Sequence, residues 1–117
     1  MVINRTIICG KLASDPEVRY TTDETPVATF SIAVERRNKN KTKEVDFHKC
    51  VAWRGLAKIC GEYLKKGKLV AVEGRLQVRK WKNRTGITKT NTEIILNDIQ
   101  LLDRKFFRDF PVEEVSE

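Results

Sequence analysis

Aromatic and basic side chains occur together at two places in the sequence, in a pattern that suits nucleic-acid binding. Phe47 and Trp53 stand an even number of residues apart with Lys49 between them, and Trp81 stands inside the basic run 79–84. An exposed ring can stack on a nucleobase, contributing about 1–3 kcal/mol per base, and lysine or arginine can neutralise a phosphate. These residue types at these spacings predict a surface that binds a single-stranded nucleic acid.

The stretch 45–54 is expected to be the strand that carries the first two rings. Successive side chains of a strand point to opposite faces, so Phe47, Lys49 and Trp53 share one face and His48 the other. A small barrel must bury one face of each strand, so the two rings could instead belong to the core. Lys49 favours the exposed alternative, because a lysine between two core aromatics would be costly to desolvate.

The stretch 69–81 is expected to form a second such strand. Its apolar face would hold Val70, Val72, Leu76 and Val78, and its other face Arg75, Gln77, Arg79 and Trp81. Trp81 has little apolar company there, which favours a stacking role over a core role. The expected phosphate contacts of this strand and its hairpin tip are Arg75, Arg79, Lys80, Lys82 and Arg84.

The stretch 36–44 has no apolar residue and is expected to be a solvated loop leading into the first aromatic strand. Such a charge run is most often only a solubilising feature. Here the positive charges outnumber the two glutamates at the borders, which favours a phosphate clamp. Its expected members are Arg36, Arg37, Lys39, Lys41 and Lys43.

The remaining periodicity supplies the elements that would position these residues. Strands are expected over 3–12, 27–35, 45–54, 69–81 and 88–102, with one helix over 55–66. Five antiparallel strands with a helix between the third and the fourth are the arrangement of an oligonucleotide-binding (OB) barrel. We expect an all-β fold with one helix, a domain spanning residues 1–103, and a short extension over 104–117 that is acidic at its end.

Composition restricts the class of protein. The chain has 117 residues, enough for one domain, and a net charge of +7, which favours an anionic partner. It shows no membrane-spanning run and no secretion signal, so we expect a cytoplasmic protein without a membrane partner. The three cysteines are too few for a metal ribbon and are expected to be reduced and mostly buried. Nothing suggests a metal site or a cofactor.

An enzyme would need a reactive cluster, and the best available is Asp46 and His48 with Glu44, as in a metal-dependent nuclease. Carboxylates are common at the start of a strand, and no second cluster converges on this one. We therefore expect a protein that is not an enzyme.

The motifs together resemble the bacterial single-stranded DNA-binding protein family, from about Ile3 to Leu102. The resemblance is carried by the order and spacing of Gly10 with Leu12, 15–20, 30–34, 47–53, 64–67, 72–76, 79–81 and Glu93. It implies sequence-independent binding and protection of single-stranded DNA in replication, recombination and repair. It also implies stacking on Phe47, Trp53 and Trp81, backbone contacts from the surrounding basic residues, a homotetramer with His48 near a subunit interface, and association with the nucleoid.

The sequence departs from the family at two places. The further stacking aromatic that is common in the family would fall near Asn38, where this chain has no ring. The family also continues into a linker and an acidic tip that recruits replication and repair proteins, whereas this sequence ends at Glu117. Phe106, Phe107 and Phe110 among acids are either an abbreviated recruiting peptide or a packed extension.

Two neighbouring functions stay open as alternatives. One is a tail-less accessory barrel of the primosome type, which would assemble as a dimer. The other is an RNA-binding barrel of similar topology, which competition between matched DNA and RNA strands would reveal.

Overall fold

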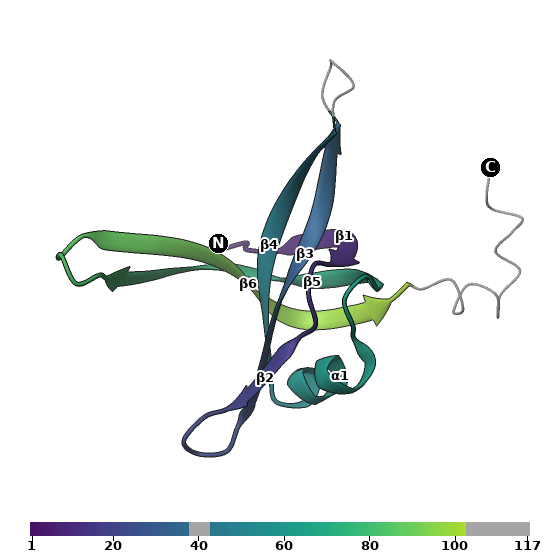
Figure 1. Ribbon diagram of the computed structural model, residues 1–117, viewed down its shortest axis with the longest axis horizontal. Coiled ribbons are helices and arrows are strands. Elements are labelled where there is room, and N and C mark those ends of the chain that lie inside the picture. The colour runs from purple at the N-terminus through teal and green to yellow at the C-terminus, as the bar shows by residue number, and fades with distance from the viewer. Residues whose placement is uncertain (38–42, 103–117) are drawn as a thin grey trace, which may run out of the picture.

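The computed structural model describes residues 1–37 and 43–102 (Figure 1). The elements follow one another as β1 (Thr6–Leu12), β2 (Glu17–Tyr20), β3 (Pro26–Arg37), β4 (Lys43–Trp53), α1 (Gly55–Tyr63), β5 (Leu69–Lys82) and β6 (Thr88–Leu101). Among these described elements, no helix is long and apolar enough to span a membrane. The same residues contain no group of three or more His, Cys, Asp or Glu side chains placed to hold a metal ion.

Five of the strands close into a barrel. The hydrogen-bonded order is β1-β5-β6-β4-β3, and β3 pairs back onto β1 through Lys11 with Ala33 and Leu12 with Ile32. All of these pairings are antiparallel except β4 with β6, which is a short parallel contact. Helix α1 lies between β4 and β5, the third and fourth strands of the barrel. The predicted OB fold is therefore confirmed, with one parallel pairing where only antiparallel strands were expected.

The core fills the barrel from alternate positions of the strands and from one side of α1. Its buried side chains include Phe30 and Ile32 of β3, Val70 and Val72 of β5, and Cys60 of α1. Burial raises the pKa of the Cys50 thiol to about 12 and that of Cys60 to about 11, with Cys60 adding to the effect on Cys50. Cys50 and Cys60 are buried as expected, whereas Cys9 is exposed.

A bulge in β6 explains why its sequence does not alternate. Glu73 pairs with Asp98 but Gly74 pairs with Leu96, which leaves Asn97 as an extra residue in β6. The side chains on the two sides of a bulge therefore change parity. Ile99 packs against the core after the bulge, and Ile94 and Leu96 lie in the core before it.

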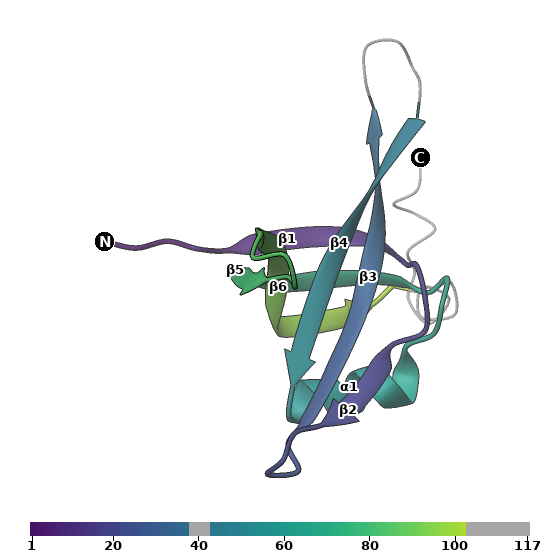
Figure 2. The same cartoon turned by 60° about the vertical axis from the view of Figure 1, so that its left-hand side comes forward.

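Two hairpins project from the barrel in different directions, β3–β4 and β5–β6 (Figures 1 and 2). The first shortens the predicted 36–44 loop, because β3 continues to Arg37 and β4 starts at Lys43. The second carries Leu76 and Val78 beyond the barrel, where they are 46% and 57% exposed. The predicted apolar face of β5 is thus buried only at Val70 and Val72, because no described element covers the outer part of the hairpin.

Two local details also differ from the sequence-based prediction. Strand β2 pairs only with β3, at the edge of the sheet, and its four residues are all exposed, so it has no buried face to produce alternation. Helix α1 ends at Tyr63 because Leu64 already has an extended backbone. Gly67 then turns the chain with φ at 90°.

Candidate nucleic-acid interface

One outer face of the barrel collects side chains from β4, β6 and β5. The register places Lys49 of β4 beside Glu93 of β6, and Glu93 opposite Gln77 of β5. Because side chains alternate along each strand, the residues that share this face follow from those pairs. They are Phe47, Lys49, Val51 and Trp53 of β4, Glu93 and Ile95 of β6, and Arg75, Gln77, Arg79 and Trp81 of β5. We call this set the aromatic-basic face.

The three predicted stacking rings are all on this face and all partly open to solvent. Phe47 is 64% exposed, Trp53 41% and Trp81 44%. The alternative that Phe47 and Trp53 are core aromatics is therefore wrong. Trp53 sits at the end of β4 over the barrel, while Phe47 and Trp81 lie further out along the two hairpins.

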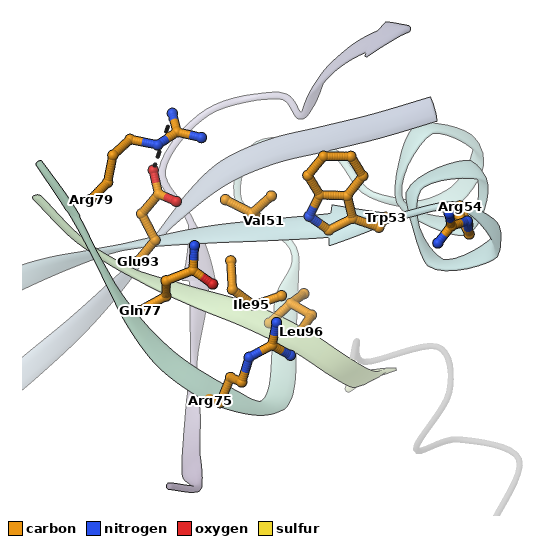
Figure 3. A pocket seen from close by; sticks show the side chains of 9 residues that line it. All are labelled: Val51, Trp53, Arg54, Arg75, Gln77, Arg79, Glu93, Ile95 and Leu96. Atoms are coloured by element: carbon orange, nitrogen blue, oxygen red, sulfur yellow. Dashed lines mark ion pairs between the residues drawn. The ribbon is translucent and has the colours of Figure 1, made fainter. Parts of the chain in front are cut away.

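Two adjoining hollows run along the aromatic-basic face. The larger, of about 500 Å³, lies between Trp53 and Arg54 on one side and Arg75, Gln77 and Arg79 on the other (Figure 3). The smaller, of about 280 Å³, continues toward β2 and β3 and includes Arg19, Tyr20 and Thr29. Both hollows share Val51, Trp53, Arg79 and Glu93. The face thus offers one groove with an aromatic wall, a floor that includes Val51, Ile95 and Glu93, and several arginines.

A buried carboxylate lies in the middle of this groove. The Glu93 side chain is only 2% exposed, and Lys49 Nζ lies 3.2 Å from its Oε2. Arg79 Nη1 approaches the same oxygen at 3.9 Å, and the pair is drawn in Figure 3. Within the described residues, Oε2 has no hydrogen-bond partner. Two predicted phosphate contacts are therefore also the counter-ions of one carboxylate.

Sequence reasoning from periodicity did not identify several residues of the groove. Gln77 was placed on the correct face but not as a site residue, and Arg54, Arg19 and Tyr20 were not considered. Tyr20 adds a further exposed ring at the rim, 66% exposed. Arg19 and Tyr20 lie within reach of Trp53 because β2, β3 and β4 pair, and Gln77 because β5 pairs with β6 and β6 with β4. Such pairing cannot be deduced from one strand at a time, whereas Arg54 could have been found because it directly follows Trp53.

Not every predicted phosphate contact shares the aromatic-basic face. Arg36 pairs with Glu44 and so lies on the opposite side of its hairpin from Phe47. Its guanidinium is held by Glu44 Oε1 at 3.0 Å and Asp46 Oδ2 at 2.8 Å. Lys80 and Lys82 alternate with Trp81 and point the other way.

The other predicted contacts are spread along the hairpins. Lys43 is exposed and lies on the same face as Phe47, and Arg37 is paired with it at the end of β3. Arg84 lies in the turn at the tip of the β5–β6 hairpin. Lys39 and Lys41 lie outside the described residues.

His48 lies on the side of β4 opposite the groove, paired with Ile32 and partly buried. Asp46 lies on the same side of β4, and Arg36 lies on that side of the neighbouring strand β3. The predicted interface residue and the predicted stacking rings are therefore on different faces of one strand.

Comparisons with known proteins agree with this geometry. A profile described as the single-strand binding protein family matches residues 3–102. The chain is 42% identical over 106 residues to a protein of Lactiplantibacillus plantarum named single-stranded DNA-binding protein, covering 89% of this chain and 53% of that protein. It is 40% identical over 118 residues to the protein of the same name from Thermotoga maritima, covering 97% of this chain and 80% of that protein.

A third relative, single-stranded DNA-binding protein A of Bacillus subtilis, is 42% identical over 106 residues, covering 89% of this chain and 62% of that protein. The chain thus spans between about half and four fifths of the length of these relatives. Matches of this extent, together with the closed barrel and its aromatic-basic face, show that the chain belongs to the single-strand binding protein family.

Proposed function

We propose that the chain binds and protects single-stranded DNA without sequence preference, in replication, recombination and repair. The observation that carries the proposal is the aromatic-basic face, where Trp53 walls a groove that also holds Lys49, Arg75 and Arg79. Stacking is tolerant of sequence because every base has a π-face. The relatives' shared name points to the same ligand.

The single-stranded DNA would follow the groove and continue onto the hairpins. Its bases stack on Trp53 over the barrel and on Phe47 and Trp81 further out, while phosphates contact the cations beside them. Arg37, Lys39, Lys41, Lys43 and Arg84 would add contacts along the hairpins and their tips, and Arg36, Lys80 and Lys82 would contact a strand that wraps around the hairpin edges. Duplex bases are already stacked and paired, so a duplex cannot use the rings.

This function needs no reaction. Base stacking and phosphate contacts need no reactive group, so we propose a protein that is not an enzyme and acts in the cytoplasm on exposed DNA of the nucleoid. Replication and repair proteins would be its protein partners. The predicted extension 104–117 lies outside the described residues.

We also propose that the chain assembles as a homotetramer. The side of the β5–β6 hairpin opposite the aromatic-basic face exposes Leu76 and Val78. Contiguous exposed apolar side chains often mark protein interfaces. His48 would lie near such a subunit contact, on the side of β4 away from the groove.

The test is a titration of intrinsic tryptophan fluorescence with oligo-dT, the corresponding duplex and a matched RNA, at low and moderate salt. We expect strong quenching by the single strand alone, weakened by salt with a slope of about −0.7 per phosphate neutralised. An equal response to duplex would contradict the proposal. Tighter binding of the RNA would favour the alternative of an RNA-binding barrel.

A further inference from the structure

Glu93 is an unusual residue for a groove that would bind a polyanion. Among the residues that the structure describes, Glu93 is the one charged or polar residue that is buried. It lines both hollows of the groove. Its carboxylate lies on the floor beside Arg79 and Gln77, with Val51 between it and Trp53 (Figure 3). A carboxylate there should repel phosphates, so its presence calls for a physical explanation.

The contacts of Glu93 indicate what it does in the free protein. Lys49 and Arg79 both approach Oε2, at 3.2 and 3.9 Å, while their own side chains remain 41% and 61% exposed. The two cations can therefore turn toward solvent or a phosphate, but the carboxylate cannot leave the floor. A buried charge that loses its partners is strongly destabilising. A phosphate that attracts Lys49 away from Glu93 therefore has to compensate for the loss of the Lys49–Glu93 ion pair.

From this geometry we infer that Glu93 attenuates the binding of single-stranded DNA, by holding Lys49 and Arg79 as internal counter-ions. The inference rests on the proposed function of the groove and adds a residue that sets its affinity. It gives Glu93 a positioning role, in which it acts on DNA through the two cations. Binding then consists of an exchange of one anionic partner for another, which favours release as well as capture.

The experiment replaces the carboxylate by its uncharged isostere, Glu93→Gln, and measures binding of labelled oligo-dT by anisotropy over a range of salt. We expect affinity at low salt to rise on the order of tenfold. The slope of log K against log salt should steepen by about 0.7 for each cation released, up to about 1.4. Only a role in charge exchange moves the slope, whereas a purely structural role would lower the melting temperature and leave the slope unchanged.

Glu73→Gln is the matched control. It removes the same charge from another partly buried, ion-paired glutamate, whose Oε2 lies 3.4 Å from Arg5 Nε and which lines a hollow that shares no residue with the two hollows of the groove. We expect its affinity and slope to match those of the wild type. A gain as large as that of Glu93→Gln would mean that net charge alone explains the effect, and would overturn the inference.

A double-mutant cycle with Lys49→Ala tests the route of the effect. If Glu93 acts through Lys49, the gain from Glu93→Gln shrinks when Lys49 is already absent, because contacting residues are not additive. Weaker binding of oligo-dT by Glu93→Gln, with an unchanged melting temperature, would overturn the inference. So would weaker binding confined to oligo-dC, since Glu93 would then accept from the base amino group. Failure of the wild type to bind any single strand would instead refute the proposed function.

Discussion

Individual residues of the aromatic-basic face differ in how firmly the fold holds them. Trp53 lies over the barrel beside Val51 and Thr29, whereas Trp81 lies near the end of β5, on the hairpin. The exposure of both rings was predicted from alternation together with the charge of their neighbours, Lys49 beside Trp53 and the basic run around Trp81. The negative charge of Glu93 on the same face was not predictable from the sequence. Glu93 contacts Lys49 only because β4 pairs with β6, and the two residues are more than forty positions apart.

Replacing Trp81 by Ala should weaken DNA binding without unfolding the barrel. Loss of one stacked base costs about 1–3 kcal/mol, or roughly a 5- to 150-fold loss of affinity. Anisotropy with labelled oligo-dT measures it, and Trp81→Phe, which keeps a ring, should recover most of the loss. A collapse of the melting temperature in Trp81→Ala would show that this side chain is structural.

The cysteines should separate into one reactive and two protected thiols. The pKa values of Cys50 and Cys60, about 12 and 11, leave almost no thiolate at pH 8, while Cys9 is exposed. Iodoacetamide at pH 8 should modify Cys9 alone, as read by peptide mass spectrometry. Equal labelling of Cys50 would contradict the buried core.

The same pKa values predict how stability changes at high pH. Above the ordinary thiol value of 9.0 the unfolded chain releases these two protons, but the native protein keeps them until pH approaches 11 to 12. The stabilising contribution is therefore complete below pH 9 and is lost as pH rises through this range. Urea unfolding of wild type and of Cys50→Ala between pH 8 and 10.5 should show a smaller loss in the variant.

Strand-level features show where sequence reasoning succeeds and where it fails. Strands β3, β4 and β5 bury alternate residues within the barrel, so their faces could be predicted from period two. Strand β6 could not be read this way because Asn97 reverses the parity, and β2 has no buried face at all. Gly10 lies where β1 leaves β5 for β3, at a close approach to the backbone of β3.

A side chain at Gly10 should therefore destabilise the barrel. The added Cβ would meet the carbonyl oxygen of Ala33 and lie 2.7 Å from Cγ2 of Ile32, so the backbone of β3 would have to move. Overpacking of this kind costs about 1–3 kcal/mol. Urea denaturation of Gly10→Ala measures it. The control is Gly55→Ala, where nothing lies within 4 Å of the new methyl group and stability should be unchanged or slightly higher.

At the scale of the whole molecule, the β5–β6 hairpin has two functions to serve. One side carries Trp81 and the arginines, and the other exposes Leu76 and Val78. If the apolar side is the subunit contact, assembly leaves the aromatic-basic face open and directs the grooves of neighbouring subunits outward. A single strand could then pass from one subunit to the next.

Leu76→Glu should dissociate the assembly while keeping the fold. The backbone of Leu76 is held by the Asn4 side chain through two hydrogen bonds of 2.9 Å, which the substitution does not remove. Light scattering should show the wild type at about four times the chain mass of 13.5 kDa and the variant below it. Ile59→Glu, which charges an exposed apolar residue of α1, should leave the assembly intact. A wild-type dimer would favour the primosome-type alternative.

The parallel pairing of β4 with β6 has a consequence for how the protein reaches its native state. Only three residue pairs join these strands, and one of them brings Lys49 to Glu93. The contact closes the barrel and assembles the floor of the groove in the same event, so an incompletely folded chain has no binding site to offer. Contacts between distant parts of a sequence form slowly because loop closure precedes any gain from pairing. A ligand that binds only the closed barrel stabilises the folded chain by mass action, so that bound single-stranded DNA would favour the native state.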